Sequence, residues 1–462
     1  MERPNAWNDY TPEQLDALEE LSSQYKDFIS QNKTERECCA AGIELARAAG
    51  YRDLADCMRE GAQLKAGDKV YAVNRNKTLL LVHLGSEPLA SGLNILGAHI
   101  DSPRLDVKQV PLDETDGFAY LDTHYYGGIK KYQWLALPLA LHGVVCKKDG
   151  STVAVHIGED PQDPVFCISD LLPHLGSEQM GKKASEFVPG EALDLLVGNR
   201  PLKLEEGSKE TPVRAQVLSL LSERLGIDEE DLLSAELEIV PAGPARDLGL
   251  DRSMILGYGH DDRICAYPSL RAQLETEAPA RTAVTLLVDK EEIGSVGATG
   301  MTSLFFEDSL AEIAALAGEG GELPLRRCLR NSRVLSSDVS AGYDPAFASV
   351  FEKKNSAFLG RGLSFNKYTG SRGKAGSNDA DAEYVALIRS VMDGAGVHFQ
   401  TSELGRVDAG GGGTIAYILA RYGMSVIDCG VPVLSMHAPW EVASKADLFE
   451  AYRGYLAFLA AE

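Results

Sequence analysis

The stretch TAVTLLVDKEEIGS, residues 282–295, decides the fold more than any other part of this chain. It opens with a continuous apolar run of strand length, and it ends in acidic residues and a glycine turn. An apolar run without polar alternation is typical of a strand that is buried on both faces, as in a parallel sheet covered by helices. The acidic residues then fall at the end of the strand, where open α/β sheets place ligands.

Similar strand-like runs precede and follow this stretch: LNILGAHI (93–100), RVLSSDVS (333–340) and MSVIDCGVPVLSMH (424–437). Helical patterns alternate with them, including SNDADAEYVALIRSVMDG (377–394) and KADLFEAYRGYLAFLAAE (445–462). A helical pattern also runs from Thr11 to about Ala48, where Thr11-Pro12-Glu13 supplies a cap and a first-turn proline. Strands that alternate with helices predict an α/β fold with a mixed, mostly parallel sheet covered by helices.

The residue composition and the hydrophobic pattern of the sequence change between residues 105 and 245. Here Tyr/Gly-rich, apolar and polar stretches follow one another, beginning near YLDTHYYGGIKKYQW. A chain of 462 residues also exceeds the roughly 250–300 residues at which one core stops growing. We therefore predict an inserted, β-rich second domain at 105–245 and a discontinuous catalytic domain formed by 1–104 and 246–462.

Composition excludes several classes of partner and compartment. The formal net charge is −23, which disfavours binding to nucleic acid and to anionic membrane surfaces. No stretch approaches the roughly 20 apolar residues of a membrane span, and the start MERPNAWNDYTPEQ lacks the apolar core of a signal peptide. The eight cysteines form no C-x-x-C pair, so we expect reduced thiols and a cytoplasmic protein.

Two segments place imidazole and carboxylate groups next to each other. In GAHIDSPRLDVK, His99 and Asp101 are two residues apart and point the same way if extended, so the carboxylate can orient the imidazole. In GYGHDDRICAY, a carboxylate such as that of Asp261 can bridge two metal ions. Ordinary explanations also exist: a strand-end histidine satisfied by its neighbour, and an acidic helix N-terminus with Arg263 as a salt-bridge partner.

Three further groups follow apolar strands. The adjacent Glu291 and Glu292 must project in different directions, so one can bind a metal while the other takes a proton from metal-bound water. An exposed acidic turn explains the pair equally well. Asp338 ends a strand among small residues, and His437 leaves a strand before Ala-Pro, so both are candidate metal ligands.

Together these segments resemble the aspartyl aminopeptidase and vacuolar aminopeptidase I family of dinuclear-zinc exopeptidases, in particular a bacterial branch. The resemblance spans most of the chain and rests mainly on GAHIDSPRLDVK, DKEEIGS, SSDVSAG and LSMHAPWEVASKADL. It implies a zinc-exopeptidase fold and an enzyme that removes the N-terminal residue from peptides. Where many members follow the bridging aspartate with asparagine, this chain has Asp262.

The resemblance also implies roles for individual residues. Asp261 would bridge two Zn²⁺ ions per subunit, with His99 and Asp338 on one ion and Glu292 and His437 on the other; Mn²⁺ or Co²⁺ are possible substitutes. Glu291 would be the general base, supported by Asp101. The inserted domain would form dimers, and dimers would assemble into a twelve-subunit particle.

Three residues are predicted to contact the peptide substrate. His174 is the best match to a family histidine that reaches a neighbouring active site. The glycine run VDAGGGGTIA, with Gly411 inside it, has no P-loop lysine and is interpreted as backbone that lines the substrate site. Lys367, with Arg372 and Lys374, offers positive charge to an acidic side chain, although the surrounding segment differs from that of acid-specific members.

Two other functions remain open at this stage. One is a related co-catalytic metallohydrolase, such as a carboxypeptidase or an N-acyl amino acid deacylase. The other is a catalytically silent scaffold, which would be expected to lack the base or a ligand.

Overall fold

The computed structural model describes residues 3–370 and 373–462, and these divide into two compact units. The first unit comprises Met1–Ser102, Ala245–Met436 and Glu441–Glu462, and the second comprises Pro103–Pro244 with His437–Trp440. The range predicted for the inserted domain, 105–245, overlaps the Pro103–Pro244 segment of the second unit. Arg372 lies outside the described residues.

The main sheet of the first unit has nine strands in the described residues, in the order β1-β2-β3-β13-β4-β14-β18-β16-β17. Their bounds are β1 Arg52–Asp53, β2 Lys69–Asn74, β3 Thr78–His83, β4 Leu93–His99, β13 Thr282–Val288, β14 Arg333–Ser337, β16 Leu363–Asn366, β17 Phe399–Thr401 and β18 Ser425–Gly430. The central strands β13, β4, β14 and β18 run parallel to their neighbours in this group. The predicted fold class, a mixed and mostly parallel α/β sheet, is confirmed.

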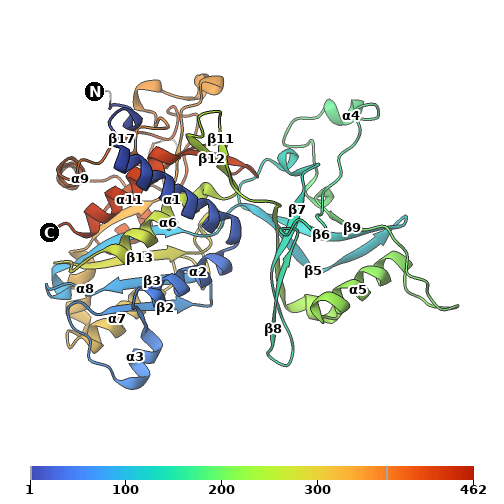
Figure 1. Ribbon diagram of the computed structural model, residues 1–462, viewed down its shortest axis with the longest axis horizontal. Helices are drawn as coiled ribbons and strands as arrows, with labels where there is room; N and C mark the ends of the chain where they lie inside the picture. Colours follow the sequence, from blue (N-terminus) through green and yellow to red (C-terminus); the bar gives the residue numbers. More distant parts are fainter. Residues whose placement is uncertain (1–2, 371–372) are drawn as a thin grey trace. The chain divides into compact units, whose positions relative to one another are not determined.

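Side chains alternate between the two faces of this sheet, as strand geometry requires. Along β4, Leu96 and Ala98 enter one buried cluster, whereas Leu93 and Ile95 enter the other. The first cluster is covered by α1 (Pro12–Gln31), α2 (Glu35–Ala48), α6 (His260–Glu275), α9 (Ala382–Gly394) and α11 (Lys445–Leu459). The second is covered by α3 (Leu54–Glu60), α7 (Phe305–Leu316), α8 (Glu322–Arg330) and α10 (Ala416–Ala420), and Figure 1 shows α1 and α7 on opposite faces.

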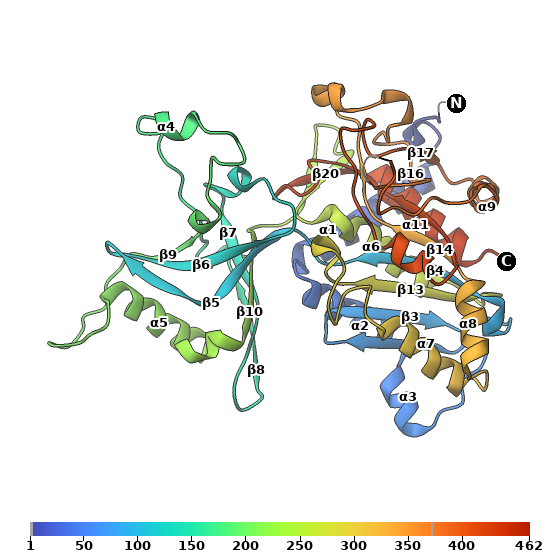
Figure 2. The ribbon, with the colours of Figure 1, turned by 180° about the vertical axis from the view of Figure 1, so that it is seen from behind.

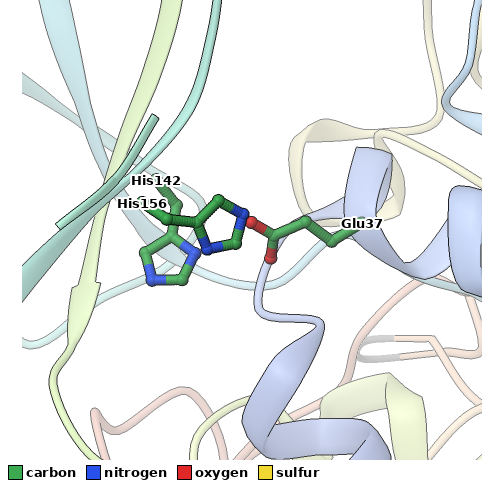
Figure 3. A group of neighbouring side chains, drawn as sticks. All are labelled: Glu37, His142 and His156. Atoms are coloured by element: carbon green, nitrogen blue, oxygen red, sulfur yellow. The ribbon is translucent and has the colours of Figure 1, made fainter. Parts of the chain in front are cut away.

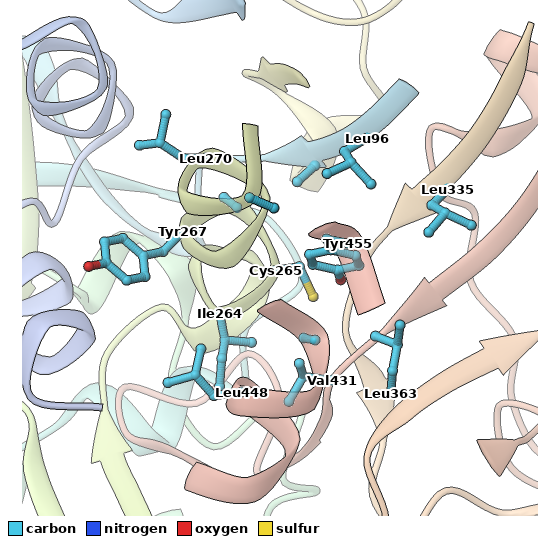
Figure 4. Close-up of a cluster of buried hydrophobic side chains, with 14 of the residues drawn as sticks. Leu96, Ile264, Cys265, Tyr267, Leu270, Leu335, Leu363, Val431, Leu448 and Tyr455 are labelled. Atoms are coloured by element: carbon cyan, nitrogen blue, oxygen red, sulfur yellow. The ribbon is translucent and has the colours of Figure 1, made fainter. Parts of the chain in front are cut away.

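Helix α6 is packed into the middle of the first cluster (Figure 4). Its residues Ile264 and Leu270 are fully buried, together with Leu96 of β4, Leu335 of β14 and Tyr455 of α11. The start of α6 carries Asp261, so this packing fixes the position of a predicted metal ligand relative to the strands.

The helical pattern predicted from Thr11 to Ala48 is broken into two helices. Helix α1 begins at the predicted cap, where Thr11 and Gln14 form a capping box. It ends at Gln31, and α2 begins after Thr34, which forms a second capping box with Glu37. The Thr-x-x-Glu spacing at residues 34–37 is a start signal that the sequence reading overlooked.

A smaller sheet of the first unit includes the two strands that follow Pro244 in the chain and the two strands on either side of residues 437–440. It has the order β11-β12-β20-β19-β15 in the described residues. The bounds are β11 Arg246–Leu248, β12 Met254–Gly257, β15 Ser340–Ala341, β19 Pro432–Leu434 and β20 Glu441–Ser444. Strand β12 leads directly into α6, and β20 carries Glu441.

The second unit contains a six-stranded antiparallel sheet in the order β8-β7-β10-β5-β6-β9 (Figure 2). Its strands are β5 Arg104–Thr115, β6 Phe118–Tyr126, β7 Leu139–Cys146, β8 Thr152–Ile157, β9 Leu195–Gly198 and β10 Ala235–Pro241. Helix α5 (Pro212–Leu225) buries Val213, Ala215 and Val217, and α4 (Ser177–Met180) is short. Across the described residues of both units, the helices are all too short or too polar to cross a bilayer.

Candidate metal centre

Three neighbouring strands of the main sheet deliver the predicted site residues to one edge. Strand β4 ends at His99, which is in register with Val288 at the end of β13. Strand β14 runs parallel to β4 on its other side and is followed by Asp338. Because parallel strands have their carboxyl ends at the same edge, His99, Glu291 and Asp338 come together although they are far apart in the sequence.

His99 is at the centre of this group and is buried. Its Nδ1 atom lies 2.9 Å from the backbone oxygen of Asp101 and 3.3 Å from Oδ1 of the same residue. Oxygen atoms of this kind only accept, so Nδ1 carries a hydrogen and Nε2 is the nitrogen that faces the other carboxylates. Nε2 lies 3.2 Å from Oδ1 of Asp261, 3.9 Å from Oδ1 of Asp338 and 4.0 Å from Oε2 of Glu291.

Asp101 does more than orient the imidazole. Its Oδ1 accepts the backbone N–H of Glu291 at 3.1 Å, and its Oδ2 accepts the backbone N–H of Glu292 at 3.2 Å. These amides open a short 3-10 turn, Glu291–Ile293, and Lys290 before it has a left-handed backbone. One buried carboxylate therefore fixes both the histidine and the two glutamates, a role that the sequence reading assigned only in part.

The start of α6 is held by a buried polar network that sequence reasoning missed. Tyr25 donates its hydroxyl hydrogen to Nδ1 of His260 at 2.8 Å, and Nε2 of His260 is 3.2 Å from the carbonyl oxygen of Ile255. Burial lowers the pKa of His260 to about 3, so this ring is neutral. His260 is thus a structural residue of the described site and not a cation.

Arg263 fixes the same turn from the other side. It donates to the carbonyl oxygens of Gly259, Tyr258 and Asn32, in place of the carboxylate partner considered above. Gly259 has a φ of +73°, and a Cβ there would lie 1.5 Å from the Arg263 guanidinium. Only glycine fits this turn, because both the backbone angle and the space exclude a side chain.

Asp261 itself is held through its backbone. Its N–H donates to Oε2 of Glu441 at 3.0 Å, and its carbonyl oxygen accepts from Ser102 at 2.7 Å. Asp261 and Asp262 have non-helical backbone angles and are buried, so they are not an exposed acidic helix N-terminus. The sequence offered no periodic signal for Glu441, since its role depends on the small sheet.

The grouped side chains offer several sets of metal-binding atoms. Ligand atoms lie within 4.8 Å of one another in three groups that share members: His99 with Glu291 and Asp338, His99 with Asp261 and Glu292, and Asp261 with Asp262 and Asp338. Among the residues that the structure describes, Nε2 of His99 and Oδ1 of Asp262 are buried without a hydrogen-bond partner. Buried polar atoms of this kind are costly unless a ligand satisfies them, so the donor set fits divalent metal ions.

The pKa values reflect the crowding of carboxylates. Burial, and then the charge of Glu291, holds the pKa of Asp338 well above its usual range. Burial alone would lower the pKa of His99, but the carboxylates of Asp101, Asp261 and Asp262 beside it hold it well above its usual range. The cluster therefore favours bound positive charge, as a cation site requires.

Asp262 stands where many members of the resembled family have asparagine, and this difference leads to a prediction. Its Oδ2 accepts the backbone N–H of His99 at 3.3 Å, and burial holds its pKa well above the usual range. The carboxamide oxygen of asparagine can accept the same bond. Because Asp262→Asn keeps this hydrogen bond, it is expected to change the rate of peptide hydrolysis by less than the 10–100-fold that follows when such a supporting contact is lost. Steady-state kinetics measures this, and a loss of bound metal in the variant would show that Asp262 is itself a ligand.

Two predicted residues belong to the second unit. His437 has its Nδ1 atom 3.1 Å from the carbonyl oxygen of Gly128, which leaves Nε2 with the lone pair that a metal needs. His174 is exposed in the loop before α4. The roles of His437 as a metal ligand and of His174 as a substrate contact stay predictions.

Lys367 and Gly411 lie in adjoining loops of the first unit. Lys367 and Lys374 both pair with Asp379, at 3.4 Å and 2.9 Å. The backbone N–H of Gly370 donates to the carbonyl oxygen of Gly412, which joins the glycine run to the Lys367 segment. Asp379 thus offsets part of the positive charge that was predicted to attract an acidic substrate.

The fold and the site together define a metallohydrolase with a carboxylate-rich centre at the edge of an α/β sheet. The chain also matches the model of the family described as aminopeptidase I zinc metalloprotease (M18) over residues 28–459. It belongs to this family of zinc metalloaminopeptidases, so the predicted family, fold and enzyme class are confirmed.

Relatives match along nearly the whole chain. A probable M18 family aminopeptidase 1 of Clostridium acetobutylicum is 58% identical over 99% of this chain and 98% of its own length. The crystal structure of an M18 aminopeptidase from Thermotoga maritima has a TM-score of 0.94 at 44% identity, covering 99% of both chains. That of aminopeptidase I from Clostridium acetobutylicum has a TM-score of 0.93 at 56% identity, covering all of both chains.

Proposed function

We propose that the protein removes the N-terminal residue from peptides with two zinc ions bound at the described edge of the main sheet. Asp261 would hold both ions, with His99 and Asp338 on one and Glu292 and His437 on the other. The observation that carries this proposal is the convergence of carboxylates from separate segments on Nε2 of His99, within 3.2–4.0 Å. Nitrogen and oxygen ligands of this kind also accept Mn²⁺ or Co²⁺.

The chemistry divides between the ions and the side chains. Peptide hydrolysis needs a nucleophile, stabilisation of an oxyanion and a proton for the leaving amine. Bound divalent ions supply Lewis-acid polarisation and a lower pKa of water. Glu291 takes a proton from the attacking water and returns it to the departing nitrogen. Asp101 holds the backbone N–H of Glu291 at 3.1 Å, which keeps this base next to the site and directs it.

Exopeptidase specificity requires recognition of the free α-amino group. The site has an excess of carboxylates over histidines, so it favours a positively charged amine in addition to metal ions. An internal peptide bond offers no such amine. Incubation with matched free-amine and N-blocked peptides tests this point: we expect hydrolysis of the free-amine peptide alone, and hydrolysis of the blocked peptide alone would favour a deacylase or carboxypeptidase.

His437→Ala tests the second ligand set. We expect this variant to lose about one zinc ion per subunit and most of its activity, because an imidazole ligand is removed from one of two ions. Elemental analysis after dialysis measures the loss. A matched variant is His83→Ala, which removes a buried histidine at the end of β3, away from the cluster. Retention of two full zinc equivalents in His437→Ala would contradict the assignment.

We also propose that the subunits form dimers that assemble into a dodecamer in the cytoplasm. A solved yeast relative, mApe1, is described as a dodecamer, and its likeness to this chain has a TM-score of 0.76 at 20% identity. Sedimentation at equilibrium gives the test, with a mass of about twelve subunits expected. The segment at 171–180 of the second unit exposes Leu171, Leu172, Leu175 and Met180, which suits a surface between subunits.

A further inference from the structure

Two histidines of the second unit face each other across neighbouring strands. His142 of β7 and His156 of β8 are directly paired in the antiparallel register. Their ring centroids are 4.6 Å apart, with an angle of 55° between the rings, and Figure 3 shows both rings on the same side of the sheet. Directly paired residues are the closest neighbours that a sheet provides, so the two imidazoles can bind one ligand together.

His142 is held in the manner of a metal ligand. It is 1% exposed, and its Nε2 atom lies 3.0 Å from Oε1 of Glu159. The other oxygen of Glu159 accepts the backbone N–H of Gly243 at 3.1 Å, so the carboxylate is itself fixed. Because the carboxylate accepts, Nε2 of His142 carries the hydrogen and Nδ1 holds the lone pair. A carboxylate that orients a histidine in this way is the usual partner of a metal-binding imidazole.

The two rings are also close enough to share an ion. A ring nitrogen of His142 and one of His156 lie within 4.8 Å of each other. Two nitrogens bound to one ion at about 2.0–2.1 Å are up to about 4 Å apart, so a small rotation suffices. His156 is exposed, whereas His142 is buried and lies 3.0 Å from Glu159.

We propose that His142 and His156 bind one first-row transition-metal ion, of which Zn²⁺ is the probe used below, with Glu159 as the residue that positions His142. Two imidazoles select this class of ion over Mg²⁺ and Ca²⁺, which prefer oxygen ligands. Water completes the coordination. The ligands of this site come from the sheet of the second unit, whereas His99 belongs to the main sheet of the first unit.

The neighbouring charges are compatible with a bound cation. On the other side of His142, the paired residue is Glu238 of β10, which lies 3.0 Å from Nε of Arg104. Glu159 and Glu238 therefore place two carboxylates beside His142, and Arg104 offsets the charge of Glu238. Negative charge therefore exceeds positive charge beside the histidine pair.

The position of the pair indicates what the ion does. Strand β8 is at the edge of the sheet and pairs with β7 alone in the described strand order. An ion held by one histidine from each strand ties the edge strand to its neighbour. Edge strands are the parts of a sheet that open most easily, so the ion is expected to reduce opening of the β7–β8 hairpin.

Equilibrium dialysis of the full-length enzyme against Zn²⁺ tests the proposal. At neutral pH the parent is expected to bind one zinc equivalent per subunit more than His156→Asn, and His142→Asn is expected to match His156→Asn. His124→Asn is the control, because His124 is an exposed histidine on β6 of the same sheet, and it should keep the parent stoichiometry. The difference counts only the additional ion, so it holds whether or not the two-zinc proposal is correct.

Peptide hydrolysis and hydrogen exchange show whether the lost ion belongs to the histidine pair. Peptide hydrolysis by His156→Asn should equal that of the parent, which separates the lost ion from the catalytic centre. Hydrogen exchange of the β7–β8 amides should slow on zinc addition in the parent and in His124→Asn, but not in His156→Asn. Equal zinc stoichiometry in the parent and His156→Asn would overturn the proposal; because His156 is exposed, this variant is expected to fold even if His142→Asn does not.

Discussion

Glu291→Gln is expected to keep its bound metal and to lose about 10²–10⁴-fold in turnover. Glutamine has the shape of glutamate but takes up no proton, so the variant removes the base and little else. The backbone N–H of residue 291 still reaches Asp101, at 3.1 Å in the parent, so the turn stays in place. Single-turnover kinetics together with elemental analysis measures both parts of this prediction.

The matched variant is Glu292→Gln. Both glutamates have an oxygen within 4.8 Å of His99 Nε2 or its neighbouring ligands, so position alone allows either one to bind metal. If Glu292 is the ligand, its variant loses zinc, whereas Glu291→Gln does not. Near-parent activity of Glu291→Gln, or loss of zinc in that variant, would reverse the two assignments.

Asp261→Asn is expected to have the second large effect. As the bridging carboxylate, Asp261 contributes to both ions, so its loss should weaken zinc binding by more than the 10–100-fold that is usual for a residue beyond the ligand shell. Competition with a chelator of known affinity gives the number, and activity should fall with zinc occupancy.

Asp262→Asn is the control for this experiment because it makes the same chemical change one residue further along. Asp262 is also buried and lies within the same group of carboxylates. A pair of variants with equal zinc affinity would contradict a bridging role for Asp261. Restoration of Asp261→Asn activity by excess zinc would support it, since the defect is then in binding.

The strand-borne part of the site could be predicted from sequence because it follows from topology. Buried parallel strands are recognisable as continuous apolar runs, and β4, β13 and β14 are adjacent. His99, Glu291 and Asp338 follow the ends of these strands, so their meeting at one edge needs no knowledge of loop conformation. The fold class was predictable for the same reason.

The supporting residues could not be predicted because they act through loops and backbone groups. Asp101 binds two amides of a turn that lies 190 residues away in the sequence. Glu441 reaches the N–H of Asp261 only because β20 and β12 pair in the small sheet. Arg263 looked like a salt-bridge residue, yet it binds carbonyl oxygens, a choice that depends on the turn at Gly259. No periodicity encodes such contacts.

The helix break at residues 32–34 is a different case, since its signal was present in the sequence. Thr34 and Glu37 form a capping box, and the apolar pattern on both sides had concealed it. By contrast, the charge of Lys367 was visible, but its pairing with Asp379 was not. Selectivity for acidic peptides therefore could not be judged from the number of basic residues.

Anomalous diffraction from zinc-loaded crystals, recorded at the zinc edge, tests the central claim most directly. Two peaks are expected at the edge of the main sheet in each subunit, both in contact with Asp261. One should touch His99 and Asp338, and the other Glu292 and His437. A single peak, or two peaks with Glu291 as a ligand and Glu292 away from the metal, would contradict the account.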